Sequence, residues 1–392
     1  MRRAIPIALV LVALGAGAVA ALVTGNLAPA ASSAGPSPSA VARASLPAEA
    51  SAPAGTVGPS PSPSASAEPT PVPTPTLVPA PLDGVLVPPD VAARHPIAVM
   101  IDDLSPARPQ SGFNSASVVW QAPAEGGIPR YMMIFQETVP AAVGPVRSAR
   151  YYFIAWAAEW RATYVHAGGS PQALTTLRAQ GRGQLVYNAD AFRFEGRNLW
   201  RIKTRFSPHN LYTDGKNLLA MAKAVGAKDG LFAPAWTFAP DAPLADRPVG
   251  GRIQVAYLAN NIRYDYERAT NTYRRSVRNT SPQVDAVGGK PVSPKNVIIM
   301  LVRFGPLNDG HPNKQRLEAT VIGKGTAWIA TNGRTIKGTW RKTSLTKPTL
   351  FYDAAGNPVT LTVGQTFIQV MQTGTPVTVK DGKVPARPTG PR

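Results

Sequence analysis

The 392-residue sequence contains no cysteine, which excludes disulfide bridges and thiolate metal sites. Histidine occurs only four times, and never with the spacing of a zinc motif such as H-E-x-x-H. The glycine patterns of a P-loop or a dinucleotide-binding fold are missing, as is the G-x-S-x-G elbow of a serine hydrolase. We therefore expect neither a metal site nor a cofactor.

Acidic residues are also scarce, with 22 Asp and Glu against 41 Lys and Arg, so the formal net charge is +19. Only five charged residues lie in the first 81 positions, so nearly all of this excess falls in the part that we expect to fold. Such an excess attracts polyanions, for example a cell-wall polymer, peptidoglycan or anionic lipid. Nucleic acid is a less favoured partner because no RNP, zinc-finger or helix-turn-helix pattern is present. Solubility is the plainest alternative explanation for the charge.

Residues 1–24 predict a transmembrane anchor or an export signal. Arg2 and Arg3 precede residues 4–23, which carry no charge, and a helix of that length spans about 30 Å, the hydrocarbon core of a bilayer. The positive charges favour a cytoplasmic N-terminus, with the bulk of the chain outside the cytoplasm. A signal peptide cleaved after Ala18-Val19-Ala20 is the alternative, and it would release the protein. We favour the uncleaved single-pass anchor.

Residues 25–83 consist mainly of Ala, Ser, Pro and Thr, a composition that cannot bury enough apolar surface to fold. We expect a disordered, proline-stiffened linker that holds a folded part away from the membrane. Two domains are predicted beyond it, at residues 84–235 and 252–385, because the prolines of residues 236–251 indicate a second linker.

The first of these domains mixes strand and helix patterns, which indicates an α/β fold. Residues 96–101 form an apolar run of strand length, and residues 150–161 have the length and aromatic face of a helix. The second domain reads as mostly β, with a hairpin turn at Asn332-Gly333 and no long helical pattern.

Polar motifs follow the strand patterns of the first domain. In α/β folds, ligands bind beyond the carboxyl ends of strands, so we expect these motifs to share a cleft. The motifs are Asp102-Asp103, R-P-Q-S-G from Arg108, E-G-G from Glu125, G-P-V-R-S-A-R ending at Arg150, H-A-G-G-S-P from His166, and P-H-N-L-Y from Pro208.

These motifs, in this order, resemble the YerB-like family of exported bacterial proteins, and the resemblance covers about residues 84 to 375. It implies a layered β-β-α sandwich for the first domain, and it implies no particular activity. Two departures stand out: Asp103 replaces a common Asn, and the sequence lacks the lipid-bearing Cys that many family members carry.

Arg147 and Arg150 flank Ser148 at the predicted start of a helix, where guanidinium groups and free backbone N–H groups could bind a carboxylate or phosphate. The alternative is that both arginines pair with Asp102, Asp103 or Glu125 inside the fold. The full set of predicted ligand-binding residues is Arg108, Gln110, Ser111, Arg130, Arg147, Ser148, Arg150, Ser170 and Asn210.

Asp102, Glu125, His166 and His209 are the candidate catalytic residues. The two carboxylates could act as the acid and base of a glycosidase, with a histidine as an alternative base. Each could instead have a structural role, the histidines by bonding to backbone carbonyls and Glu125 by pairing with Arg130.

Three functions remain open. We favour a non-catalytic envelope protein whose basic cleft binds an anionic wall component or a membrane partner. The alternatives are a hydrolase of wall glycan or peptide, and a scaffold for a wall-synthesis protein. If the arginines dominate the cleft and the acids neutralise them, binding is favoured. If the acids and histidines meet in one cleft with strongly shifted pKa values, catalysis is favoured.

Overall fold

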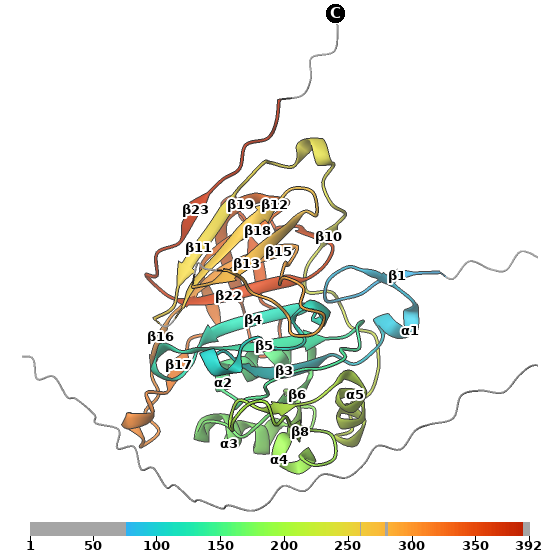
Figure 1. The fold of residues 1–392 in the computed structure, drawn as a ribbon, viewed down its shortest axis with the longest axis vertical. Coiled ribbons are helices and arrows are strands. Elements are labelled where there is room, and N and C mark those ends of the chain that lie inside the picture. Colours follow the sequence, from blue (N-terminus) through green and yellow to red (C-terminus); the bar gives the residue numbers. More distant parts are fainter. Residues whose placement is uncertain (1–75, 259, 279–280, 387–392) are drawn as a thin grey trace, which may run out of the picture. The chain divides into compact units, whose positions relative to one another are not determined.

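The computed structural model describes residues 76–258, 260–278 and 281–386 (Figure 1). The predicted anchor at residues 1–24 and nearly all of the predicted linker lie outside these residues. Among the residues described, no helix has both the length and the hydropathy needed to cross a membrane.

A ten-stranded mixed sheet contains strands from both halves of the chain. The two halves join where β22 runs parallel to β4 (Figure 1), and in this pairing Thr366 lies opposite Val118. In spatial order the strands are β20 (Leu350–Tyr352), β19 (Arg334–Lys342), β18 (Gly323–Thr331), β15 (Asn296–Val302), β22 (Thr366–Gln372), β4 (Val118–Pro123), β5 (Pro129–Phe135), β3 (Ile97–Asp102), β6 (Thr163–His166) and β7 (Tyr187–Asp190).

The central strands are covered on both faces, which explains why β3 is a continuous apolar run. Side chains of β3 alternate between two cores: Ala98 and Met100 belong to one, and Val99 and Ile101 to the other. The central strands of this sheet are therefore continuous hydrophobic runs in the sequence.

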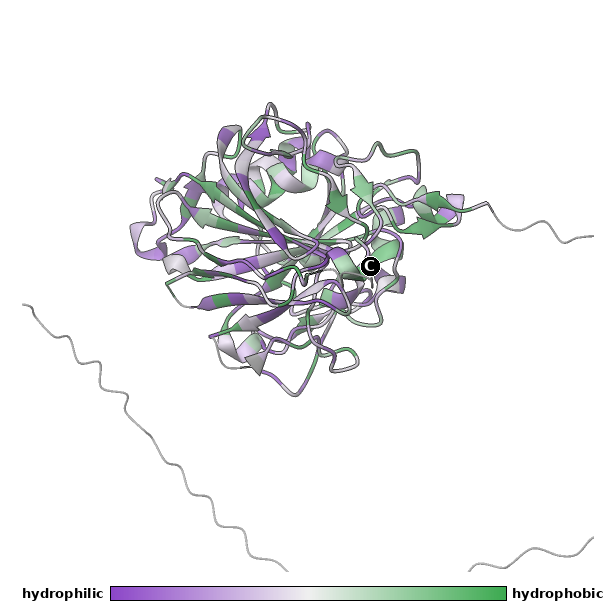
Figure 2. Cartoon of the chain, turned by 90° about the horizontal axis from the view of Figure 1, so that it is seen from above, coloured by the Kyte–Doolittle hydropathy of each residue, from purple (hydrophilic) through white to green (hydrophobic). Residues whose placement is uncertain are grey.

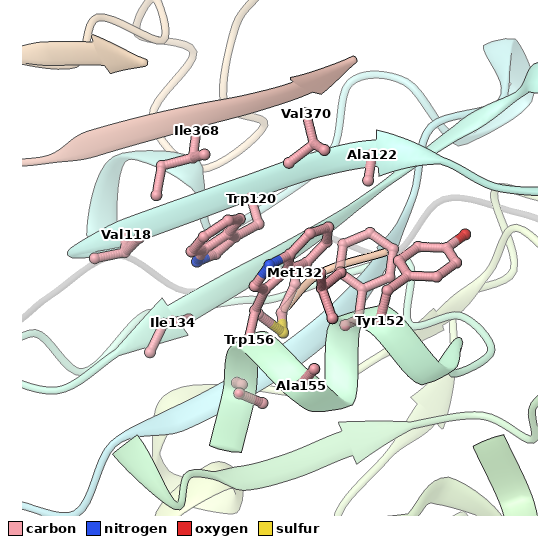
Figure 3. Close-up of a cluster of buried hydrophobic side chains, with 14 of the residues drawn as sticks. Val118, Trp120, Ala122, Met132, Ile134, Tyr152, Ala155, Trp156, Ile368 and Val370 are labelled. Carbon is pink, nitrogen blue, oxygen red and sulfur yellow. The ribbon is translucent and has the colours of Figure 1, made fainter. Parts of the chain in front are cut away.

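Helix α2 (Tyr151–Ala157) covers one face of the sheet, within the residues predicted to be helical. Its Trp156 stacks on Trp120 of β4, with ring centroids 4.6 Å apart, and both indoles are buried beside Met132 (Figure 3). The aromatic face of the predicted helix therefore packs into the core. The other helices are α1 (Pro89–Ala92), α3 (Pro171–Gln180), α4 (Ala191–Phe194) and α5 (Gly215–Ala224).

A five-stranded antiparallel sheet from the second half packs on the opposite face. Burial alternates along its strands, as in β12, so each strand has one buried and one more exposed side, and Figure 2 shows hydrophobic and hydrophilic residues along the strands. The second half thus supplies the sheet layer opposite α2. The strands, in spatial order, are β14 (Ser281–Pro282), β13 (Thr272–Val277), β12 (Asn261–Glu267), β11 (Arg252–Ala256) and β23 (Thr378–Lys380).

Four short strand pairs complete the strand-rich architecture. The described part of the second half contains strands and 3₁₀ turns but no α-helix. Trp236, at the start of the predicted second linker, is buried in the main core, and nearby Phe238 pairs with Leu361. The short pairs are β1 (Val78–Pro79) with β2 (Leu86–Val87), β8 (Trp200–Arg201) with β9 (Leu211–Tyr212), β10 (Phe238–Ala239) with β21 (Leu361–Thr362), and β16 (Phe304–Pro306) with β17 (Leu317–Ala319).

Candidate functional site

Seven strands of the large sheet run in one direction, so their carboxyl ends lie along the same edge. These strands are β3, β4, β6, β7, β15, β19 and β22; β5 runs antiparallel between β3 and β4 and begins at that edge. Asp102 ends β3 there, and Arg130 faces it across the strand pair at the start of β5. This is the edge at which sheets of this kind bind ligands.

The Asp102 carboxylate is nearly buried and contacts two basic side chains. His209 Nδ1 lies 2.6 Å from Asp102 Oδ2, and Arg147 Nε lies 3.1 Å from the same oxygen. The other oxygen, Oδ1, accepts a hydrogen bond of 3.0 Å from the backbone N–H of Leu104. The loop that carries His209 is itself fixed, because the Arg205 guanidinium donates to Ala107 O over 2.6 Å.

Glu125 is held by two further arginines beside this pair. Its Oε2 lies 2.9 Å from a terminal nitrogen of Arg130, and its Oε1 pairs with Arg150, the residue that precedes α2. Arg130 also donates to Ser148 O over 2.7 Å. Burial lowers the pKa of Arg130, and it lowers the pKa of Arg150 to about 10, which leaves the Arg150 guanidinium charged at neutral pH.

The arginine cluster, defined as Arg130, Arg147 and Arg150, thus faces two carboxylates, Asp102 and Glu125. The Nε atoms of Arg147 and Arg150 are buried, and neither has a hydrogen-bond acceptor within the described part of the chain. Arg147 Nε is close enough to Asp102 for an ion pair but lacks hydrogen-bond geometry. The cluster therefore has one more positive charge than negative charges, and two donors without acceptors.

His166 and Ser170 take part in local structure near this edge. His166 is fully buried, and its two ring nitrogens bond to Gly168 O and Asn188 Oδ1, each over 2.8 Å. Ser170 is the N-cap of α3 and accepts from the backbone N–H of Ala173. Neither side chain joins Asp102 or Glu125 through a described contact.

The remaining predicted ligand-binding residues support the loops of the site. Arg108 pairs with Asp103 over 2.7 Å, and Gln110 donates to Asp102 O over 2.8 Å. Ser111 pairs through its backbone with Gly144, and Asn210 accepts from Arg201 over 3.0 Å.

Arg275 is an important buried residue that the sequence motifs did not indicate. It lies between the two sheets, donates to Tyr264 and Gln121, and lies over the rings of Tyr131 and Phe367. The alternation of β13 was the available signal, because positions 273, 275 and 277 share the inward face.

Two family profiles match the chain. The N-terminal domain of "Protein of unknown function (DUF3048)" matches residues 82–228, and the C-terminal domain of the same family matches residues 253–368. The relative "Putative lipoprotein YerB" of Bacillus subtilis (strain 168) is 34% identical over 226 residues, which are 56% of this chain and 66% of the relative. The chain belongs to the YerB-like family.

The YerB-like fold is also seen in a solved structure. The crystal structure of YerB protein from Bacillus subtilis matches with a TM-score of 0.67 and 26% sequence identity, and the match covers 76% of this chain and 99% of that one. The YerB-like family is described as one of unknown function. The chemistry of the site therefore has to be argued from its geometry.

Proposed function

We propose that this YerB-like protein binds an anionic cell-wall component through the arginine cluster at the carboxyl edge of the large sheet. The observation that supports this function most strongly is the excess of three guanidinium groups over two carboxylates, with the buried Nε donors of Arg147 and Arg150 making no hydrogen bond within the described residues. A bound carboxylate or phosphate would contact the partly exposed guanidinium of Arg147 and reduce the repulsion among the arginines.

A ligand can reach the cluster from solvent. The side chains of Arg147 and His209 retain 17% and 16% of their exposure, and that of Glu125 retains 30%. Arg130 and Arg150 lie deeper and hold Glu125 in place. Ion pairs in such a partly buried site are screened less than those on an open surface, so each contact to an anion is stronger.

The proposed location is outside the cytoplasm and close to the membrane. Residues 4–23 would act as the anchor, and the relative named as a lipoprotein is consistent with membrane association. A scaffold that docks a wall-synthesis protein through the same basic edge is compatible with this location, but no particular contact favours it.

A hydrolase is the second candidate function, because His209 lies 2.6 Å from Asp102 and the pair could transfer a proton. Binding is favoured over hydrolysis because both Asp102 and Glu125 are engaged by arginines, and His166 bonds on both ring nitrogens to structural partners. Product release from labelled wall fragments by wild type, and its loss in Asp102→Ala, would favour the hydrolase.

Sedimentation of the full-length protein with intact wall sacculi tests the binding function. Wild type should cosediment at low salt, and Arg147→Gln should weaken binding by about tenfold, since one charge-assisted contact contributes roughly 1.5 kcal/mol. The control is Arg178→Gln, which removes the same charge from an exposed position on α3 and should change little. Failure of wild type to cosediment at low salt would overturn the proposal.

A further inference from the structure

An apolar cavity of about 690 Å³ lies at the same edge of the sheet as the arginine cluster. It is lined by Pro123 at the end of β4 and Met371 near the end of β22, together with Tyr257, Phe304 and Leu317. Cavities of this size, lined mainly by apolar groups with a few polar ones, are typical small-molecule sites. Neither family description assigns it a role.

The loop Glu125–Gly127 separates this cavity from the arginine cluster and contacts both. Glu125 pairs with Arg130 and Arg150 on one side, and Gly127 lines the cavity on the other. Gly127 has a φ of +72°, and an added Cβ would lie 2.6 Å from Leu258 Cδ1. Glycine therefore permits both the left-handed turn and the close approach of Leu258.

Arg316 connects the cavity to the cluster electrostatically. Its side chain lines the cavity and pairs with Asp309. Beyond the effect of burial, its charge also lowers the pKa of Arg130 and of Arg150, so the three guanidinium groups are close enough to repel. Arg316 and the three arginines of the cluster face Asp102, Glu125 and Asp309, so four positive charges stand against three negative ones beside an apolar cavity.

Two residues that line the cavity have features typical of a ligand-binding surface. Leu258 lines the cavity although 91% of it is exposed, an arrangement that an apolar ligand would cover. Gln315, also in the wall, has a φ of +47°, a strained conformation for a residue other than glycine. Its carbonyl accepts from Gly126 N over 3.3 Å, which ties the wall to the Glu125 loop.

We propose that this cavity receives the apolar chain of an amphipathic anion whose phosphate or carboxylate head lies at Arg316, beside the arginine cluster. The inference rests on the proposed anion-binding function and adds the requirement that the ligand carry an apolar chain. Charge attracts the head to the excess of arginine, and removal of the chain from water adds affinity that a bare anion lacks.

Titration calorimetry of the full-length protein with decyl phosphate, below its micelle concentration, tests this proposal against inorganic phosphate. Wild type should bind decyl phosphate at least about tenfold more tightly, because the chain buries several methylene groups. Arg316→Gln should weaken the binding of both compounds. Leu258→Ser should weaken only the binding of decyl phosphate, by about fivefold.

The control is Leu231→Ser, since Leu231 is fully exposed and does not line this cavity. It should leave both affinities unchanged, and circular dichroism should show that all variants remain folded. Equal affinity of wild type for decyl phosphate and phosphate would overturn the cavity inference and leave anion binding intact. Failure to bind either compound, with no binding to sacculi, would overturn both proposals.

Competition identifies the source of the ligand once decyl phosphate binds. Displacement of the bound probe by phosphatidylglycerol vesicles would support a membrane lipid as the natural amphiphile. A probe that stays bound in the presence of these vesicles would support a soluble amphiphile of the same chemistry. Both results require the cavity to be occupied by an apolar chain.

Discussion

Asp102 and Asp103 are neighbours in the chain, but their side chains lie on opposite faces of the large sheet. Asp102 lies on the face covered by α2, where it contacts His209 and Arg147 at the accessible edge. Asp103 points toward the second sheet and is completely enclosed. Its carboxylate accepts hydrogen bonds from Arg108, Gln121, Tyr131 and Asn260.

The two environments differ in how completely their polar groups are satisfied. The network around Asp103 continues through Gln121 to Arg275, whose guanidinium bonds to three side chains and lies over three aromatic rings. In the cluster around Asp102, the Nε atoms of Arg147 and Arg150 make no hydrogen bond within the described residues, and the Arg147 side chain is partly exposed. We infer that the first network holds the two sheets together, whereas the second is available to a ligand.

The largest expected effect comes from breaking the enclosed network. Arg275→Met should lower the free energy of unfolding by about 3–5 kcal/mol, because it removes a buried guanidinium that donates to Tyr264 and Gln121 and leaves Arg108 as the remaining partner charge of Asp103. Chemical denaturation followed by circular dichroism measures this loss. Arg274→Met is the matched control, since Arg274 is exposed and pairs with the exposed Glu267, and it should cost less than about 1 kcal/mol. Equal losses in the two variants would contradict a structural role for the network.

A second prediction concerns the opposite edge of the sheet, where Asp83 lies near Glu137. Burial, together with the charge of Glu137, raises the pKa of Asp83 to about 8 from its ordinary value of 3.8. The folded state therefore holds a proton on Asp83 that the unfolded chain releases, so this group's contribution to stability is complete below pH 3.8 and is lost as the pH rises through 8.

Denaturation curves at a series of pH values across this window test the Asp83 prediction. Wild type should lose this contribution as the pH rises, and Asp83→Asn should lose less because an amide stays neutral. Asp90→Asn, at an exposed position of α1, should keep the wild-type dependence. An Asp83→Asn variant with the full wild-type dependence would assign the titration to another group.

Part of the site could be predicted from the sequence because its residues sit at strand ends. Asp102 follows an apolar strand, and strands that run in parallel bring their ends to one edge, so the convergence with Arg147 and His209 follows from the pattern. Only the structure distinguishes a functional from a structural role for His166 and Ser170. Sequence spacing does not specify the contacts of a buried histidine or of an N-cap residue.

The joining of the two halves in one sheet could not be predicted. The parallel pairing of β22 with β4 connects segments far apart in the chain, and no local turn marks it. For the same reason Arg316, in the second half, could not be placed beside the arginines of the first. The burial of Arg275 could not be predicted, because a charged residue on an alternating strand is ordinarily assigned to the exposed face.

The prediction with the smallest expected effect tests the central claim most directly. It compares the affinities of Asp102→Asn and Asp103→Asn for sacculi with the affinity of wild type. Asp102→Asn removes a negative charge from the arginine cluster, so binding should strengthen by about threefold to tenfold. Asp103→Asn should leave affinity unchanged in the fraction that remains folded, because its carboxylate is enclosed between the sheets. Loss of binding in Asp102→Asn, or an equal gain in both variants, would contradict the account.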